Sequence, residues 1–143
     1  MRRCGLILGA ALALLAGIGT AAAQAPALLI GNWMTTWFPN TVGEIFVTVT
    51  YVPNGQIREH LMNRQAVAYD LFGTYQYNSA TSTVQFVFAD YAPKQMCSPI
   101  GCQPAPVPPG LNTPTSAQLV FPNPNQMMAR TADGTTMIWS RTN

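Results

Sequence analysis

The chain has 143 residues, of which 48% are hydrophobic and only 8% are charged. An ordinary soluble domain has roughly 25% charged residues. So few charges exclude a protein that holds nucleic acid electrostatically, because such binding needs clustered lysines and arginines. The apolar content excludes a mostly disordered chain. The length predicts one compact domain.

The first 23 residues have the pattern of an export signal. Two arginines precede an apolar run from Leu6 to Ile18, and an A-x-A motif ends at Ala23, where we expect cleavage. A retained membrane anchor is the alternative, but the run is short for a span of roughly 20 residues and is built largely of alanine and glycine. We therefore expect a bacterial periplasmic or secreted protein, with residues 24–143 as its domain and no stable membrane span after cleavage.

Removal of the export signal leaves two cysteines, Cys97 and Cys102. An even pair in an oxidising compartment predicts a disulfide. Closing so short a ring contributes about 2 kcal/mol in the chain-entropy model. A zinc site would need a second pair of ligands, and a redox-active pair would have C-x-x-C spacing.

The rest of the sequence consists of short apolar or alternating runs separated by turn residues, which predicts strands and no helix. In residues 44–52, the clearest strand, Ile45, Val47, Val49 and Tyr51 share one face. The sequence Pro53-Asn54-Gly55 then predicts a tight hairpin turn. The expected strands are 29–38, 44–52, 56–63, 71–77, 83–90, 117–121, 126–131 and 135–141.

Seven or eight evenly spaced strands joined by tight turns predict an all-β, antiparallel up-and-down meander. We expect this meander to close into a small barrel rather than form a sandwich, because few strands carry the charges that protect open edges. Residues 91–116 interrupt the pattern with seven of the twelve prolines and both remaining cysteines. We interpret them as a loop insertion, extended and stiff over residues 104–110, that is either functional or a flexible excursion.

Several motifs resemble those of lipocalin-like (calycin) barrels, in particular small bacterial exported domains. Gly31-x-Trp33 is similar to the G-x-W motif of their first strand, and residues 51–55 and 72–75 are similar to two later strand-and-turn motifs. The resemblance covers residues 29–143. It implies that Trp33 plugs the barrel base, that Gly31 lets the chain turn in, and that Arg141 covers Trp33. The chain differs in its shorter length, its missing C-terminal helix and its insertion.

The sequence offers little for catalysis. His60 is the only histidine, so a zinc site of several imidazoles is excluded. A Ser-His-Asp triad would need Asp70 or Asp90 to orient His60, but there is no G-x-S-x-G nucleophile motif. We interpret residues 58–60 as the polar part of a hairpin arm. With scattered carboxylates and no glycine-rich phosphate loop, we expect no enzyme, no metal and no cofactor.

The aromatic residues that recur through the strands point to a different role. They either fill an ordinary core or line a cavity that holds one small hydrophobic or lipid-like ligand. The candidate ligand-binding residues are Tyr51, Phe86 and Phe88 on inward faces, with Tyr75 and Tyr77 near a rim. The alternative is an envelope protein-interaction or inhibitor module, whose partner would bind the disulfide-pinned, proline-rich residues 97–114.

Overall fold

The computed structural model describes residues 26–65 and 68–143. The expected export signal, residues 1–23, lies outside the described residues. Among those described, all regular structure is β-strand, as predicted, and no helix is long and apolar enough to span a membrane. The strands are β1 (Gly31–Trp37), β2 (Ile45–Tyr51), β3 (Gln56–Asn63), β4 (Ala68–Asn78), β5 (Thr83–Ala92), β6 (Gln95–Ser98), β7 (Gly101–Pro104), β8 (Thr115–Asn123), β9 (Gln126–Thr131) and β10 (Thr136–Thr142).

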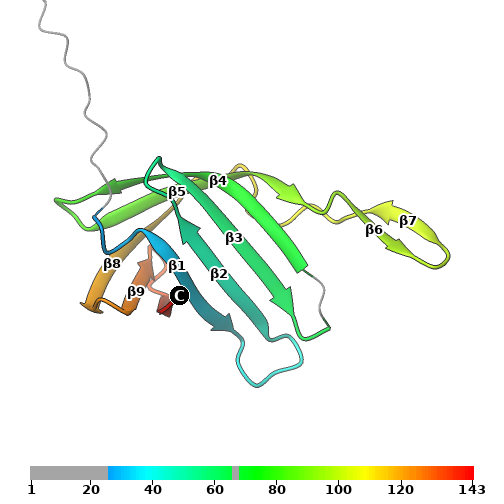
Figure 1. The fold of residues 1–143 in the computed structure, drawn as a ribbon, viewed down its shortest axis with the longest axis horizontal. Coiled ribbons are helices and arrows are strands. Elements are labelled where there is room, and N and C mark those ends of the chain that lie inside the picture. The colour runs from blue at the N-terminus through cyan, green and yellow to red at the C-terminus, as the bar shows by residue number, and fades with distance from the viewer. Residues whose placement is uncertain (1–25, 66–67) are drawn as a thin grey trace, which may run out of the picture.

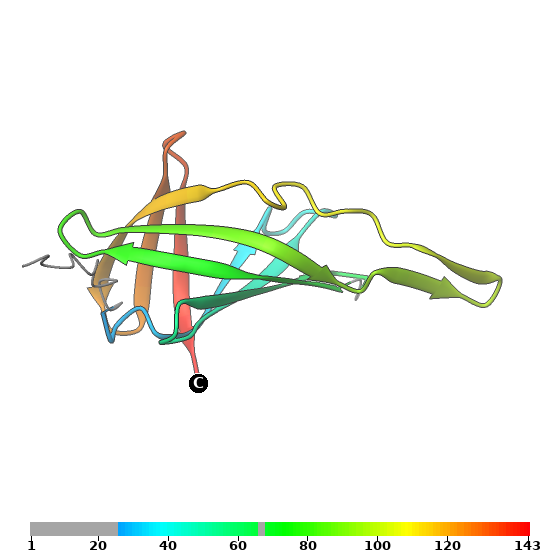
Figure 2. The ribbon, with the colours of Figure 1, turned by 90° about the horizontal axis from the view of Figure 1, so that it is seen from above.

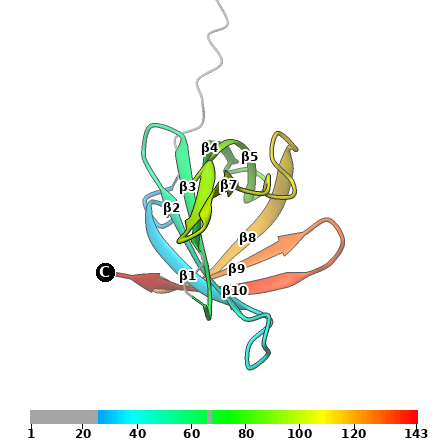
Figure 3. The same cartoon turned by 90° about the vertical axis from the view of Figure 1, so that its right-hand side faces the viewer.

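Eight of these strands form a closed antiparallel barrel in the order β1-β10-β9-β8-β5-β4-β3-β2. Figure 3 shows them arranged in a ring when the molecule is seen from the side of the β6–β7 hairpin. The first and last strands close the barrel, with Trp33 opposite Arg141 and Met34 opposite Ser140. The predicted meander barrel is therefore confirmed, and the sandwich is excluded.

Alternation along each strand separates the core from the surface. In β2, Val47, Val49 and Tyr51 are buried, whereas Phe46, Thr48 and Thr50 lie on the outer face, as the sequence pattern predicts. The buried residues of the other barrel strands meet these side chains inside the barrel. The core is consequently the interior of a single closed sheet.

The antiparallel register gives the barrel two different ends. One end, which we call the base, carries the turns at residues 52–55, 79–82 and 124–125, and residues 26–30 lie against it. The other end, which we call the mouth, carries the connections at residues 38–44, 93–114 and 132–135. Leu29 and Trp33 are fully buried near the base.

A glycine allows β4 and β5 to approach closely at a bulge. The register between these strands shifts at Phe72/Gly73. A Cβ atom on Gly73 would lie 2.0 Å from the carbonyl oxygen of Val87, which is far inside van der Waals contact. Gly73 therefore permits a backbone contact that no other residue allows without a shift of the chain.

The proline-rich insertion contains more structure than the sequence suggests. Strands β6 and β7 form a two-stranded hairpin, and Cys97 and Cys102 pair across it and are joined by the predicted disulfide. Figures 1 and 2 show this hairpin projecting away from the barrel. The expectation of a loop throughout residues 91–116 is wrong, because β5 runs on to Ala92 and the disulfide joins two paired strands. The longest stretch of the insertion without regular structure is residues 105–114.

Candidate ligand-binding cavity

The barrel encloses a cavity with a volume of about 300 Å³. Its wall is formed by apolar side chains from all eight barrel strands, among them Val49, Leu71, Val84, Leu119 and Met127. Residues Pro108, Pro109 and Gly110 of the insertion also contribute to the wall. The cavity thus extends through the middle of the barrel toward the mouth, where the insertion borders it.

The base of the barrel is closed by Trp33 and Arg141. The Trp33 indole N–H donates a hydrogen bond of 2.9 Å to the Leu29 carbonyl oxygen, and the Arg141 guanidinium carbon lies 4.4 Å from the centre of the Trp33 ring. Arg141 also donates hydrogen bonds to the carbonyl oxygens of Leu28, Ile30 and Pro124. One arginine therefore ties the N-terminal segment and the β8–β9 turn over the buried tryptophan.

Gly31 makes room for this arginine. Its φ of +125° favours glycine, and a Cβ atom at this position would lie only 2.8 Å from Arg141 Nη1. The structure therefore places Gly31, Trp33 and Arg141 together at the base, in the arrangement that the family resemblance implies.

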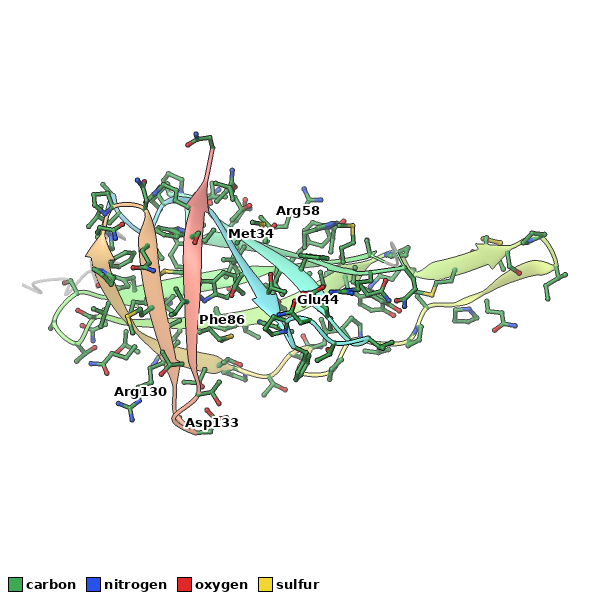
Figure 4. All side chains as sticks on the ribbon, turned by 90° about the horizontal axis from the view of Figure 1, so that it is seen from below. Met34, Glu44, Arg58, Phe86, Arg130 and Asp133 are labelled. Atoms are coloured by element: carbon green, nitrogen blue, oxygen red, sulfur yellow. A yellow bond between two sulfur atoms is a disulfide. The ribbon has the colours of Figure 1, made fainter. Side chains whose placement is uncertain are left out.

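Three of the five predicted ligand-binding residues lie on the cavity wall. Tyr51, Phe86 and Phe88 all contribute to it, and the Phe86 and Phe88 rings are 5.5 Å apart. In Figure 4 the labelled Phe86 side chain lies between the strands, whereas Arg58 and Arg130 project outward. These aromatic residues come from β2 and β5, which are not neighbouring strands of the barrel.

The other two predicted residues, Tyr75 and Tyr77, are not part of this wall and do not lie at its rim. Both are buried in the core. The Tyr75 ring packs edge-on against Tyr51 at 5.0 Å, and its hydroxyl donates a 2.8 Å hydrogen bond to the Val52 carbonyl oxygen. β4 runs from mouth to base, so its later residues reach the base, which is why the structure places these tyrosines away from the mouth.

Sequence reasoning missed Glu59, the carboxyl group on the cavity wall. Its side chain is only 9% exposed, and its neighbours across the sheet are Val49 and Leu71. No described residue donates a hydrogen bond to it, and burial in apolar surroundings raises its pKa to about 7. The interpretation of Glu59 as part of a polar arm is wrong, because alternation along β3 turns it inward between Ile57 and Leu61.

Two tryptophans add further polar groups to this apolar wall. Trp37 and Trp139 both line the cavity, and their indole nitrogens are fully buried without a hydrogen-bond partner within the described part of the chain. Tyr51 is on the same wall. Burial raises the pKa of the Tyr51 hydroxyl, and the charge of Glu59 is a smaller cause of the same shift.

Charged pairs elsewhere lie outside the cavity wall. At the mouth, Arg64 binds Glu44, and this hydrogen bond holds the pKa of Glu44 below its ordinary value. Lys94 likewise binds Asp90 at 2.6 Å. These pairs bring opposite charges together away from the cavity wall and leave Glu59 without a cationic partner among the described residues.

His60 lies on the outer face of the barrel. Its Nδ1 atom is 2.9 Å from Asp70 Oδ1, and Arg58 Nη2 is also 2.9 Å from the same oxygen. Of the two aspartates considered for a triad, Asp70 therefore contacts His60, whereas Asp90 binds Lys94. No serine among the described residues hydrogen-bonds to His60, so the group consists of a surface carboxylate shared by two basic side chains.

The described residues contain no group of three or more His, Cys, Asp or Glu side chains that could hold a metal ion. Comparison with known proteins adds no family assignment, since no family model matches the chain and no curated protein matches its sequence.

Proposed function

We propose that this protein is an exported, lipocalin-like barrel that binds one small hydrophobic molecule in its cavity, without catalysis. The observation that carries the proposal is the enclosed volume of about 300 Å³ behind an almost wholly apolar wall. Pockets for small ligands are typically concave, mostly apolar and provided with a few polar groups. A well-packed core leaves few voids larger than a water molecule, so a volume of this size favours a container over a filled core.

The construction of the two ends supports the same proposal. Trp33 and Arg141 seal the base with hydrogen bonds to the carbonyl oxygens of Leu29 and Ile30. At the mouth, residues 108–110 border the cavity from a segment without regular structure. A ligand would therefore enter from the mouth, past the insertion.

The location proposed is the periplasm or the external medium. Its support is the disulfide between Cys97 and Cys102, since disulfides persist in oxidising compartments. The export signal expected at residues 1–23 agrees with this location.

Filling the cavity tests the proposal. We use octanol as an uncharged probe and measure its binding by calorimetry and by the emission of the wall residues Trp37 and Trp139. Ala117 is buried on the wall, so Ala117→Phe places a ring in the space where the probe would lie. We expect the affinity for octanol to fall about tenfold or more.

The matched control is Gln118→Phe, which adds the same ring at the next residue on the outer face of β8. It should leave octanol binding unchanged. Circular dichroism checks that both variants keep the fold. If the unaltered protein binds no octanol, or if both variants bind it as well as the unaltered protein, the proposal is wrong.

The second candidate function is an interaction module that acts through the β6–β7 hairpin. Its support is the projection of this hairpin from the barrel, with Ile100 97% exposed at its tip. A disulfide across the pair reduces the freedom that the hairpin would lose on docking.

A further inference from the structure

Among the residues that the structure describes, the cavity wall carries one acidic group and no basic one. Glu59 lies on the wall, nine-tenths buried, with no described hydrogen-bond donor. An ionised carboxylate buried without a partner is costly, and such groups are generally paired. The inward-facing residues on either side of Glu59, Ile57 and Leu61, are apolar. Its cross-strand neighbours Val49 and Leu71 are apolar as well, so the described residues do not supply the partner.

The cations of the described chain are engaged elsewhere. Arg58 and His60 contact Asp70 on the outer face, Arg64 binds Glu44, and Lys94 binds Asp90. Arg141 is held by backbone carbonyls at the base, and Arg130 is exposed on the outer face of β9. None of them lines the cavity. The missing positive charge would therefore have to come with the ligand.

We propose that the ligand is a small hydrophobic amine whose ammonium group binds the Glu59 carboxylate while its apolar part fills the cavity. This inference rests on the proposed function, since it assigns the ligand class of the same cavity. A charge-assisted hydrogen bond in a water-poor site is stronger than a neutral one. Trp37, Trp139 and Phe86 also line the cavity, and the faces of aromatic rings attract cations rather than anions.

The same arrangement disfavours fatty acids. A carboxylate ligand would bring a second negative charge beside Glu59, with no arginine, lysine or histidine on the wall to compensate it. Like charges at close range in a low-dielectric site repel strongly. An alcohol avoids this repulsion and can donate one hydrogen bond to the carboxylate, but it brings no positive charge to neutralise it.

Three probes with one alkyl chain test the inference: octylamine, octanol and octanoic acid, each titrated calorimetrically at about pH 8. At this pH Glu59 is mostly ionised, because its pKa is about 7. We expect octylamine to bind about ten- to a hundredfold more tightly than octanol, and octanoic acid to bind most weakly.

Glu59→Gln should bring the ratio of octylamine to octanol affinity close to one. The matched control is Glu44→Gln, which makes the same change at the chain's other glutamate, outside the cavity wall, and should keep the ratio of the unaltered protein. Because Glu59→Gln removes a buried charge, this variant should still fold, and circular dichroism checks that it does.

The outcomes separate this inference from the proposed function. Octanol binding without preference for octylamine overturns the amine inference and leaves the hydrophobic cavity standing. Tightest binding of octanoic acid, or a preference that persists in Glu59→Gln, also overturns it. If none of the three probes binds, the proposed function fails together with the inference.

Discussion

At the scale of single residues, Glu59 shows how a charged side chain can be misread. Its neighbours Arg58 and His60 are polar and lie outside, which makes the three residues resemble a solvated stretch. Successive side chains of β3 nevertheless point to opposite faces of the sheet, and Ile57 and Leu61 lie on the inner face. The signal that identifies Glu59 was therefore present in the sequence as a period of two, with a carboxyl at an apolar position.

The burial of Glu59 predicts an unusual dependence of stability on pH. The folded protein holds this proton up to a pKa of about 7, whereas the unfolded chain releases it near 4.5. Between these values the folded state binds more protons, so stability falls as the pH rises from about 4.5 to 7. The difference in pKa corresponds to about 3 kcal/mol in the free energy of unfolding. Glu59→Gln should remove this fall, as measured by urea unfolding from about pH 4.5 to 8.

Glu44→Gln provides the contrast. Arg64 lowers the pKa of Glu44, so this group stabilises the fold above the pKa of the unfolded chain and loses that effect as the pH falls. The Glu44→Gln variant should therefore still lose stability as the pH rises from about 4.5 to 7. If the unaltered protein and Glu59→Gln have parallel stability profiles over this range, Glu59 is not buried as a neutral acid.

At the scale of elements, the strands were largely predictable. The expected ranges 56–63 and 126–131 coincide with β3 and β9, because turn residues bound both strands closely. β4 begins three residues earlier than expected, at Ala68, and β8 begins at Thr115. These additions lack clear alternation, and the pairing with neighbouring strands that extends them is a long-range effect that a local pattern does not contain.

The β6–β7 hairpin was not predictable as an element. Its strands are only four residues long and are flanked by prolines, which indicate irregular structure. The cysteine spacing did predict the bond between Cys97 and Cys102, but not that the residues on either side of it would pair. Even short strands can pair when a covalent link holds them in register.

Removing this hairpin separates the two candidate functions. Replacement of residues 96–103 by a short glycine-containing turn retains the buried Ala105 and the wall residues 108–110. Because the hairpin is mostly exposed, we expect the free energy of unfolding to change by less than about 1 kcal/mol and octanol binding to persist. Urea unfolding and calorimetry check both. Loss of octanol binding in this variant would instead place the hairpin in the function of the cavity.

At the scale of the whole molecule, closure makes the barrel a container. Each strand buries one face against the interior, and the pairing of β1 with β10 leaves no free edge in the barrel. The sequence predicted this closure, but it did not predict whether the interior is filled. That depends on how side chains from eight strands meet, and it is also why two of the five predicted ligand-binding residues lie in packed core instead.

At the base, Arg141 near the end of β10 joins the segment that precedes β1. Arg141→Met removes three hydrogen bonds to backbone carbonyls and the cation above Trp33, while it keeps much of the apolar stem. We expect a loss of about 2–3 kcal/mol in the free energy of unfolding, measured in urea by tryptophan emission. Arg130→Met makes the same change at an exposed position on β9 and should cost less than about 0.5 kcal/mol. Equal effects of the two substitutions would show that Arg141 does not hold the base closed.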